Sequence, residues 1–198
     1  MTPLQGELGA AVGRLWDVLG DRQSLFPDLP DDAVLARARS GELAEAMPRL
    51  LELAIGGGFE RVAVTLPFDM LREADWTTWP AEQRSALEDV MDTWWSWTRT
   101  AIDPEPSPGL VLACLCRLGV PQIRWLGPFL DDLDGPAARH LVDVVRGQLP
   151  EPEWEGFDDQ RSQILAWCRT EPVIIGLTVV GGVHLEPGQL SEALDLML

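Results

Sequence analysis

The sequence predicts an all-α fold, an irregular helical array or α-solenoid of about ten helices. Apolar residues recur at spacings of three and four along most of the chain, which is the period of a helix buried on one face. Pro and Gly stand between these segments, where helices begin and end. Hydrophobic residues make up 46% of the 198 residues, enough for a packed core. We therefore expect one all-α domain over residues 1–198.

The N-terminal part contains three predicted helices. An apolar stripe runs through 4–19 and stops at Gly20. Residues 30–39 open with a proline and two aspartates, which suit the N-terminal end of a helix. We expect Ser40 to cap the next helix, which runs to residue 55 before three glycines, and Pro48 to kink or restart it.

The middle of the chain contains one ambiguous segment and one long helix. Within 59–74, the run VAVTL has strand propensity, but we expect a helix because the neighbouring segments are helical. Trp79-Pro80 begins a helix that should reach about residue 102, because proline is tolerated in a first turn. A proline-rich connector follows at 102–109.

The C-terminal part contains further short helices. The segment after Pro172 could be a strand by propensity or a helix stopped by glycines at 181 and 182, and we expect a helix. A last helix begins at Pro187. The remaining predicted helices cover 110–119, 121–133, 135–149 and 158–170, with a polar acidic loop at 150–159.

Three tryptophans occupy four positions of the long helix, as Trp94, Trp95 and Trp97. On a helical wheel Trp94 lies on the central apolar face, and the other two flank it by roughly 80° on either side. The apolar arc is therefore roughly 160° wide, more than an ordinary amphipathic stripe. Such a helix must be covered on more than one side, so we expect the cluster to form the core of the array.

Candidate partner-binding residues fall in two places. Trp76 and Trp79, with one of the flanking indoles, could form an exposed groove for a partner. Trp154 is the best candidate for a single exposed indole because few apolar residues surround it, although it could instead fold back and tether its loop. An indole among carboxylates can hold an Arg or Lys of another chain. The neighbouring carboxylates are Glu151, Glu153, Glu155, Asp158 and Asp159.

The net charge of −17 limits the possible partners. Such a charge repels nucleic acid and anionic membrane surfaces, and it attracts basic proteins. High solubility is its simplest consequence. The chain contains no Lys and no Tyr, which removes Schiff-base lysine chemistry and a tyrosine acid. We expect a basic protein partner, with neither nucleic acid nor membrane; the oligomeric state stays open.

No motif predicts a catalytic centre, a metal site or a cofactor. Cys114 and Cys116 would lie on opposite sides of a helix, with only two histidines in the chain to complete a zinc site. The Asp cluster at 131–134 does not fit a calcium loop, and there is no GxSxG. A Cys–His pair stays open by spacing alone. The low, odd cysteine count and the absence of a signal-like N-terminus predict a cytoplasmic protein.

Several segments resemble a group of uncharacterised bacterial all-helical proteins. Residues 47–54 match a PRxLEL pattern, 71–79 contain a W..W pair, and 190–198 are similar to their C-terminal ends. The resemblance covers about half of the chain and implies an all-helical fold without a known activity. More loosely, the pattern resembles HEAT-like arrays, which are mostly binding scaffolds.

The sequence therefore favours a non-enzymatic, acidic, α-helical protein-binding module. A more specific form is an immunity or antitoxin-like inhibitor that caps a basic toxin by charge complementarity. The alternative is a small enzyme or small-molecule-binding protein with a pocket lined by Trp94, Trp95 and Trp97.

Overall fold

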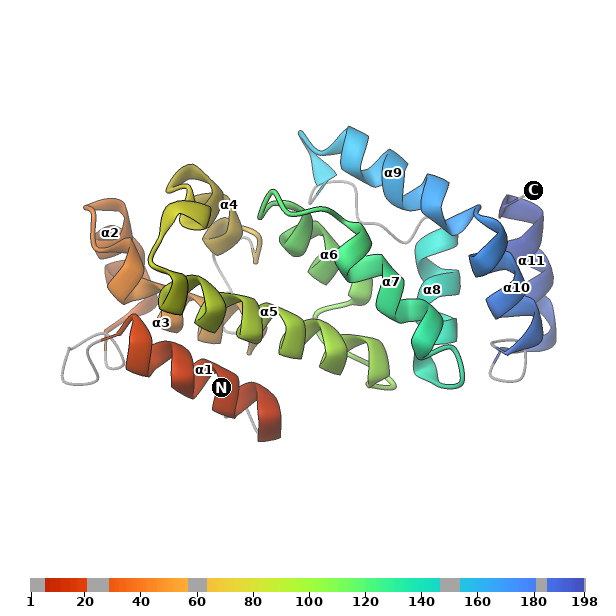
Figure 1. Ribbon diagram of the computed structural model, residues 1–198, viewed down its shortest axis with the longest axis horizontal. Helices are drawn as coiled ribbons and strands as arrows, with labels where there is room; N and C mark the ends of the chain where they lie inside the picture. The colour runs from red at the N-terminus through yellow and green to blue at the C-terminus, as the bar shows by residue number, and fades with distance from the viewer. Residues whose placement is uncertain (1–5, 21–28, 57–63, 147–153, 181–184, 198) are drawn as a thin grey trace. The chain divides into compact units, whose positions relative to one another are not determined.

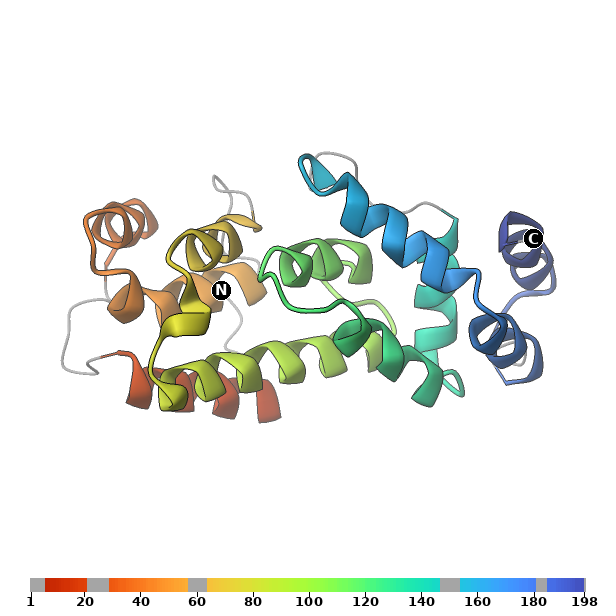
Figure 2. The same ribbon diagram turned by 45° about the horizontal axis from the view of Figure 1, so that its top comes forward.

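The computed structural model describes residues 6–20, 29–56, 64–146, 154–180 and 185–197 (Figure 1). These residues form eleven α-helices and no strand, which confirms the predicted all-α fold and fits an irregular array of about the expected size. Figure 2 shows the same helices in a second view. Within the described residues, no helix combines the length and the apolar character needed to cross a membrane.

The chain divides into two compact units, Met1–Trp94 and Trp95–Leu198. The division falls inside one long helix, so the proline-rich connector at 102–109 lies within the second unit. The first unit contains α1 (Gly6–Val18), α2 (Asp31–Arg39), α3 (Leu43–Ile55), α4 (Leu66–Glu73), a 3-10 turn (Trp76–Thr78) and the first part of α5 (Ala81–Thr100).

The helix α3 is the centre of the first unit. It packs against α1, α2 and α4, and its apolar residues are buried on most sides. The Trp16 indole of α1 donates a hydrogen bond to the Glu52 carboxylate of α3 at 2.7 Å. Arg14 and Asp89 form an ion pair between α1 and α5. Apolar burial and these polar contacts together hold the first unit.

Two details of α3 differ from the prediction. Ser40 does not cap α3 but ends α2, where its hydroxyl donates to the Arg37 carbonyl at 2.8 Å. Glu42 occupies the N-cap position of α3 instead, because Gly41 turns the chain with a φ of 109°. The helix also runs through Pro48 without a restart, one of the two outcomes expected there. Pro48 stands in its second turn and has no N–H to donate to the carbonyl four residues before it.

Of the segment predicted as a helix over 59–74, the structure describes residues 64–74. Thr65 stands at the N-cap position of α4, so the helical part starts at Leu66. Residues 64–65 form a turn, and the start of the VAVTL run lies outside the described residues.

The second unit follows the predicted order closely. Residues 172–179, where strand and helix were both possible, belong to a helix. Gly176 fits this packing, because an added Cβ would lie 2.6 Å from Leu133 Cδ1. The unit contains the last part of α5 with α6 (Pro108–Cys116), α7 (Ile123–Asp131), α8 (Pro136–Val145), α9 (Asp158–Cys168), α10 (Glu171–Val179) and α11 (Pro187–Met197).

Adjacent tryptophans of α5 enter the cores of different units. Trp94 is completely buried and stacks on Phe68 of the first unit, with ring centroids 5.7 Å apart. Trp95 packs edge-on against Phe129 of the second unit at 5.2 Å. The prediction that the cluster forms core is therefore right for these two indoles. It is wrong for Trp97, which is 43% exposed.

Buried polar side chains bond to main-chain oxygens at helix ends of the second unit. Arg99 donates to the Pro128 carbonyl at 2.7 Å and forms an ion pair with Asp132 at the end of α7. The Nε2 of His140 lies 2.7 Å from the Ala101 carbonyl, just past the end of α5. Helix ends leave carbonyls without an intrahelical donor, and these side chains supply one.

Candidate binding surface of the second unit

Trp76 and Trp79, predicted to line a groove, lie in the first unit at the 3-10 turn before α5. The turn packs on α4 and begins at Asp75, whose φ of 47° is left-handed. The Trp76 indole is only 4% exposed, so the prediction that it faces an exposed groove is wrong. Trp79, which ends the turn, is half-buried and remains a candidate contact.

Trp154 lies in the second unit and is also buried, with 1% of its surface exposed. A turn closes when the Phe157 N–H donates to the Trp154 carbonyl at 2.8 Å. Residues three apart in such a turn lie on one side, so both rings point inward while Glu155 remains outside. The prediction of an exposed indole is therefore wrong, and the alternative of a tether agrees with the burial. The carboxylate neighbours indicated a solvated loop, but of the turn's described residues Glu155 is exposed while Trp154 is buried.

Three of the predicted carboxylates are exposed around the start of α9. Asp158 and Asp159 form its first turn, and Glu155 precedes it. Glu151 and Glu153 lie outside the described residues.

A groove of about 490 Å³ lies next to these carboxylates along α9. Residues 119–123, which connect α6 to α7, form one wall. Gln160 and Gln163 of α9 form the other, and the buried Cys116 completes the lining. The volume lies within the usual range of binding pockets, roughly 300–1,000 Å³.

The described lining of the groove combines apolar side chains with uncharged polar ones. Three glutamine amides, from Gln122, Gln160 and Gln163, lie along it, and Ile123 is 61% exposed beside them. Among the described residues that line this groove, none has an acidic or basic side chain. The arrangement suits neutral hydrogen-bonding groups better than a bare ion.

A cation–π contact between Arg117 and Phe157 joins the two elements on either side of the groove. The Arg117 guanidinium lies 4.5 Å from the centroid of the Phe157 ring and donates to the Ala113 carbonyl at 2.9 Å. Arg117 follows α6, whereas Phe157 stands immediately before α9. Because a buried cation–π contact contributes about 2 kcal/mol, this pair fixes the start of α9 against the end of α6.

Cys116 does not provide a reactive nucleophile. Burial raises the pKa of the Cys116 thiol to about 12, with a small opposing effect of Arg117. The thiol is therefore neutral near pH 7, and only the thiolate is an effective nucleophile. Among the described residues, no group of three or more His, Cys, Asp or Glu side chains is placed to hold a metal ion.

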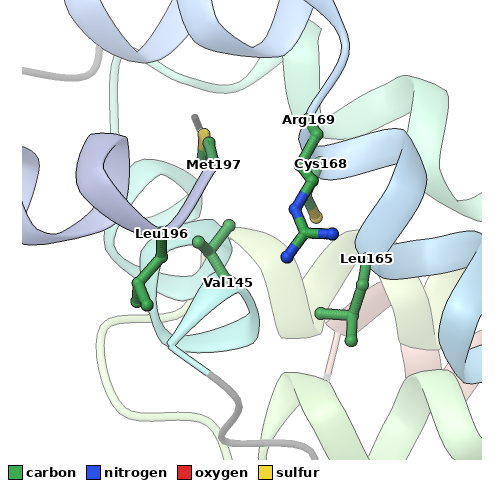
Figure 3. Close-up of a pocket in the computed structure, with 6 residues that line it drawn as sticks. All are labelled: Val145, Leu165, Cys168, Arg169, Leu196 and Met197. Atoms are coloured by element: carbon green, nitrogen blue, oxygen red, sulfur yellow. The ribbon is translucent and has the colours of Figure 1, made fainter.

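A second cavity lies where α8, α9 and α11 meet (Figure 3). The side chains of Val145, Leu165, Cys168, Arg169 and Met197 surround it, together with Leu196. Its volume of about 10 Å³ is room for one water molecule at most, so it is a packing defect and not a ligand site.

The large apolar side chains that are exposed in the described residues all belong to the second unit. Three of them, Ile175, Val179 and Val180, lie on α10 or directly after it. The others are Trp97, Ile102, Ile123 and Leu196.

Comparison with known proteins gave no match, whether to protein-family models, to curated proteins or to solved structures.

Apart from Cys116, the groove residues belong to no motif that marks a site in the sequence. Gln160 and Gln163 stand three apart on a predicted helix, which is a weak signal because such pairs are common on solvated faces. Their approach to Gln122, which precedes α7, depends on tertiary packing alone.

Proposed function

We propose that this protein is a non-enzymatic module that binds a basic partner protein through its second unit. The observation that carries the proposal is that, among the described residues, every exposed large apolar side chain belongs to that unit. Single exposed apolar residues are common on any protein, but they should then occur in both units.

The charge distribution supports a basic partner. Protein interfaces take most of their affinity from a few apolar or aromatic anchors surrounded by polar residues. Here Gln160 of the groove directly follows the exposed Asp158 and Asp159 on α9, and the exposed Ile123 lines the same groove. The net charge of −17 would accelerate encounter with a cationic protein and make the association sensitive to salt.

An inhibitor of a basic toxin is the narrow form of this function. It requires an exclusive, tight complex in which the partner's own activity is blocked. Inhibition of one purified basic enzyme or toxin would favour this form, whereas binding several basic proteins with similar affinity would favour a general scaffold.

The alternative, a small-molecule site lined by tryptophans, has less support. Trp94 and Trp95 are covered by neighbouring side chains, and neither the groove nor the small cavity has a tryptophan in its lining.

The proposal is tested in two steps: a partner protein is captured from a lysate, and the surface it covers is then mapped by hydrogen exchange. The tagged chain is exposed to a lysate of its source organism at low and high salt, and a protein retained only at low salt is identified and purified. Hydrogen exchange is then compared in the free chain and the reconstituted complex. We expect a basic protein, and slower exchange within residues 95–180 but not within 6–56. Retention of an acidic protein, or slowing confined to the first unit, would contradict the proposal.

A further inference from the structure

We propose that the groove beside α9 binds an extended segment of the partner through that segment's main chain. The inference rests on the proposed function and adds the form of the ligand: a basic stretch without secondary structure of its own. Extended segments of this kind expose peptide groups along both edges.

The groove contains hydrogen-bond donors and acceptors that can pair with those of a peptide group. A glutamine amide carries N–H donors and a carbonyl acceptor in one plane, as a peptide group does. Within the described residues, the amide side chains of Gln122, Gln160 and Gln163 form no hydrogen bond. They are therefore available to bond to a ligand in place of water.

The spacing of the amides suits an extended chain. Gln160 and Gln163 are three residues apart on α9, which separates them by about 4.5 Å along the helix axis. An extended chain rises about 3.3 Å per residue, so flexible side chains at this separation reach neighbouring peptide groups. Gln122 approaches from the opposite wall and can bond to the other edge of the same segment.

The surroundings favour basic residues in that segment. Asp159 is exposed and lies four residues before Gln163, on the same face of α9. Asp158 and Glu155 extend the acidic surface beyond the helix start. The helix N-terminus carries a partial charge of about +0.5, which offsets only part of these carboxylates. Ile123 provides an apolar contact for an alternate side chain.

A second copy of this chain is a poorer occupant. Each copy would bring a net charge of −17 to a surface that is already acidic.

Synthetic peptides test the inference, because recognition of the main chain tolerates many side-chain sequences. The probe is a fluorescent peptide of about eight residues that alternates Arg and Val, so that successive side chains take opposite faces. A second peptide has the same sequence with alternate main-chain nitrogens methylated, which keeps the charge but removes donors. Binding to the full chain is measured by fluorescence anisotropy. We expect methylation to weaken binding by about tenfold or more, as the loss of two or three hydrogen bonds implies.

Matched variants locate the site. Replacing Gln122, Gln160 and Gln163 together by Leu should cause a similar loss, whereas Gln83→Leu in the first unit should cause none. Thermal unfolding of each variant verifies that it is folded. Neutralising Glu155, Asp158 and Asp159 to Gln or Asn should weaken both peptides equally and reduce the dependence on salt.

Three results would overturn the inference: no binding of the unmethylated peptide, equal binding of both peptides, or equal affinities of the triple and Gln83→Leu variants. So would sedimentation that shows a dimer of the wild-type chain but not of the triple glutamine variant, because a second copy would then occupy the groove. If salt-sensitive capture of a basic protein persists in the triple variant, the proposed function survives and only recognition of the main chain is excluded.

Discussion

The two units of the molecule differ in how they use polar and apolar side chains. In the described residues of the first unit, large apolar side chains are at least partly covered, and every charged residue keeps at least partial exposure. The second unit buries Arg99, Arg117 and His140, and it exposes large apolar groups such as Val179, which is 70% exposed. The first unit therefore has the pattern of a self-contained core, whereas the second carries the exposed apolar side chains on which the proposed function rests.

The buried polar groups have a common role. Arg99, Arg117 and His140 each meet a main-chain carbonyl at or near a helix end. The helices of the second unit are short, so a large share of their carbonyls lacks an intrahelical donor. Arg117 satisfies a carbonyl of its own helix, whereas Arg99 and His140 reach carbonyls of other elements and link them more specifically than apolar contact alone.

The largest expected loss of stability comes from replacing the adjacent residues Trp94 and Trp95. Because each is buried in a different unit, each replacement should affect a different unit. Trp94→Ala and Trp95→Ala should each reduce the free energy of unfolding by about 3–5 kcal/mol, because each leaves a cavity in a buried core. In the first variant, hydrogen exchange should accelerate mainly in residues 6–56, and in the second mainly in 108–180. If both variants accelerate exchange in the same segments, the units do not behave as separate cores.

Trp154→Ala should reduce stability by about 3 kcal/mol, because this indole is almost completely buried. Chemical denaturation measures the change. Glu155→Ala on the outer side of the same turn is the control and should change stability by less than about 0.5 kcal/mol. A Trp154 variant as stable as the control would show that the indole is a surface group after all.

Arg99→Met should cost about 2 kcal/mol, since it leaves the Pro128 carbonyl and the Asp132 carboxylate without their partner. Burial lowers the pKa of Arg99, an effect that Asp131 opposes. The matched control is Arg139→Met, whose ion pair with Asp103 is exposed and should contribute little. Equal losses from the two variants in thermal unfolding would contradict the role given to the buried arginine.

The smallest effect is expected at the exposed apolar face of α10. Ile175→Ser combined with Val179→Ser should change stability by about 0.5 kcal/mol or less, because neither side chain is covered. The buried Leu177→Ser, on the same helix, should cost several times more. A large loss in the exposed pair, measured by urea denaturation of the isolated protein, would mean that this face is covered within the chain itself.

The sequence determined most of the helices, because their signals are local. Periodicity marked the apolar faces of α1 and α5, and Pro or Gly marked most boundaries, including the start of α11 at Pro187. The prediction was wrong where the neighbouring residues allowed the same residue to begin one helix or to end another. Ser40 can cap the helix that follows or end the one that precedes it, and the choice depended on the turn at Gly41.

Tertiary structure alone decided which indoles are covered and where a groove forms. Trp95 and Trp97 flank the same helical face almost symmetrically, yet one is buried against Phe129 and the other is 43% exposed. Trp154 is buried despite its acidic neighbours, and Gln122 meets α9 only through the packing of α6 and α7. A helix's own sequence fixes the direction in which each side chain points, but only distant segments fix whether anything lies there to cover it.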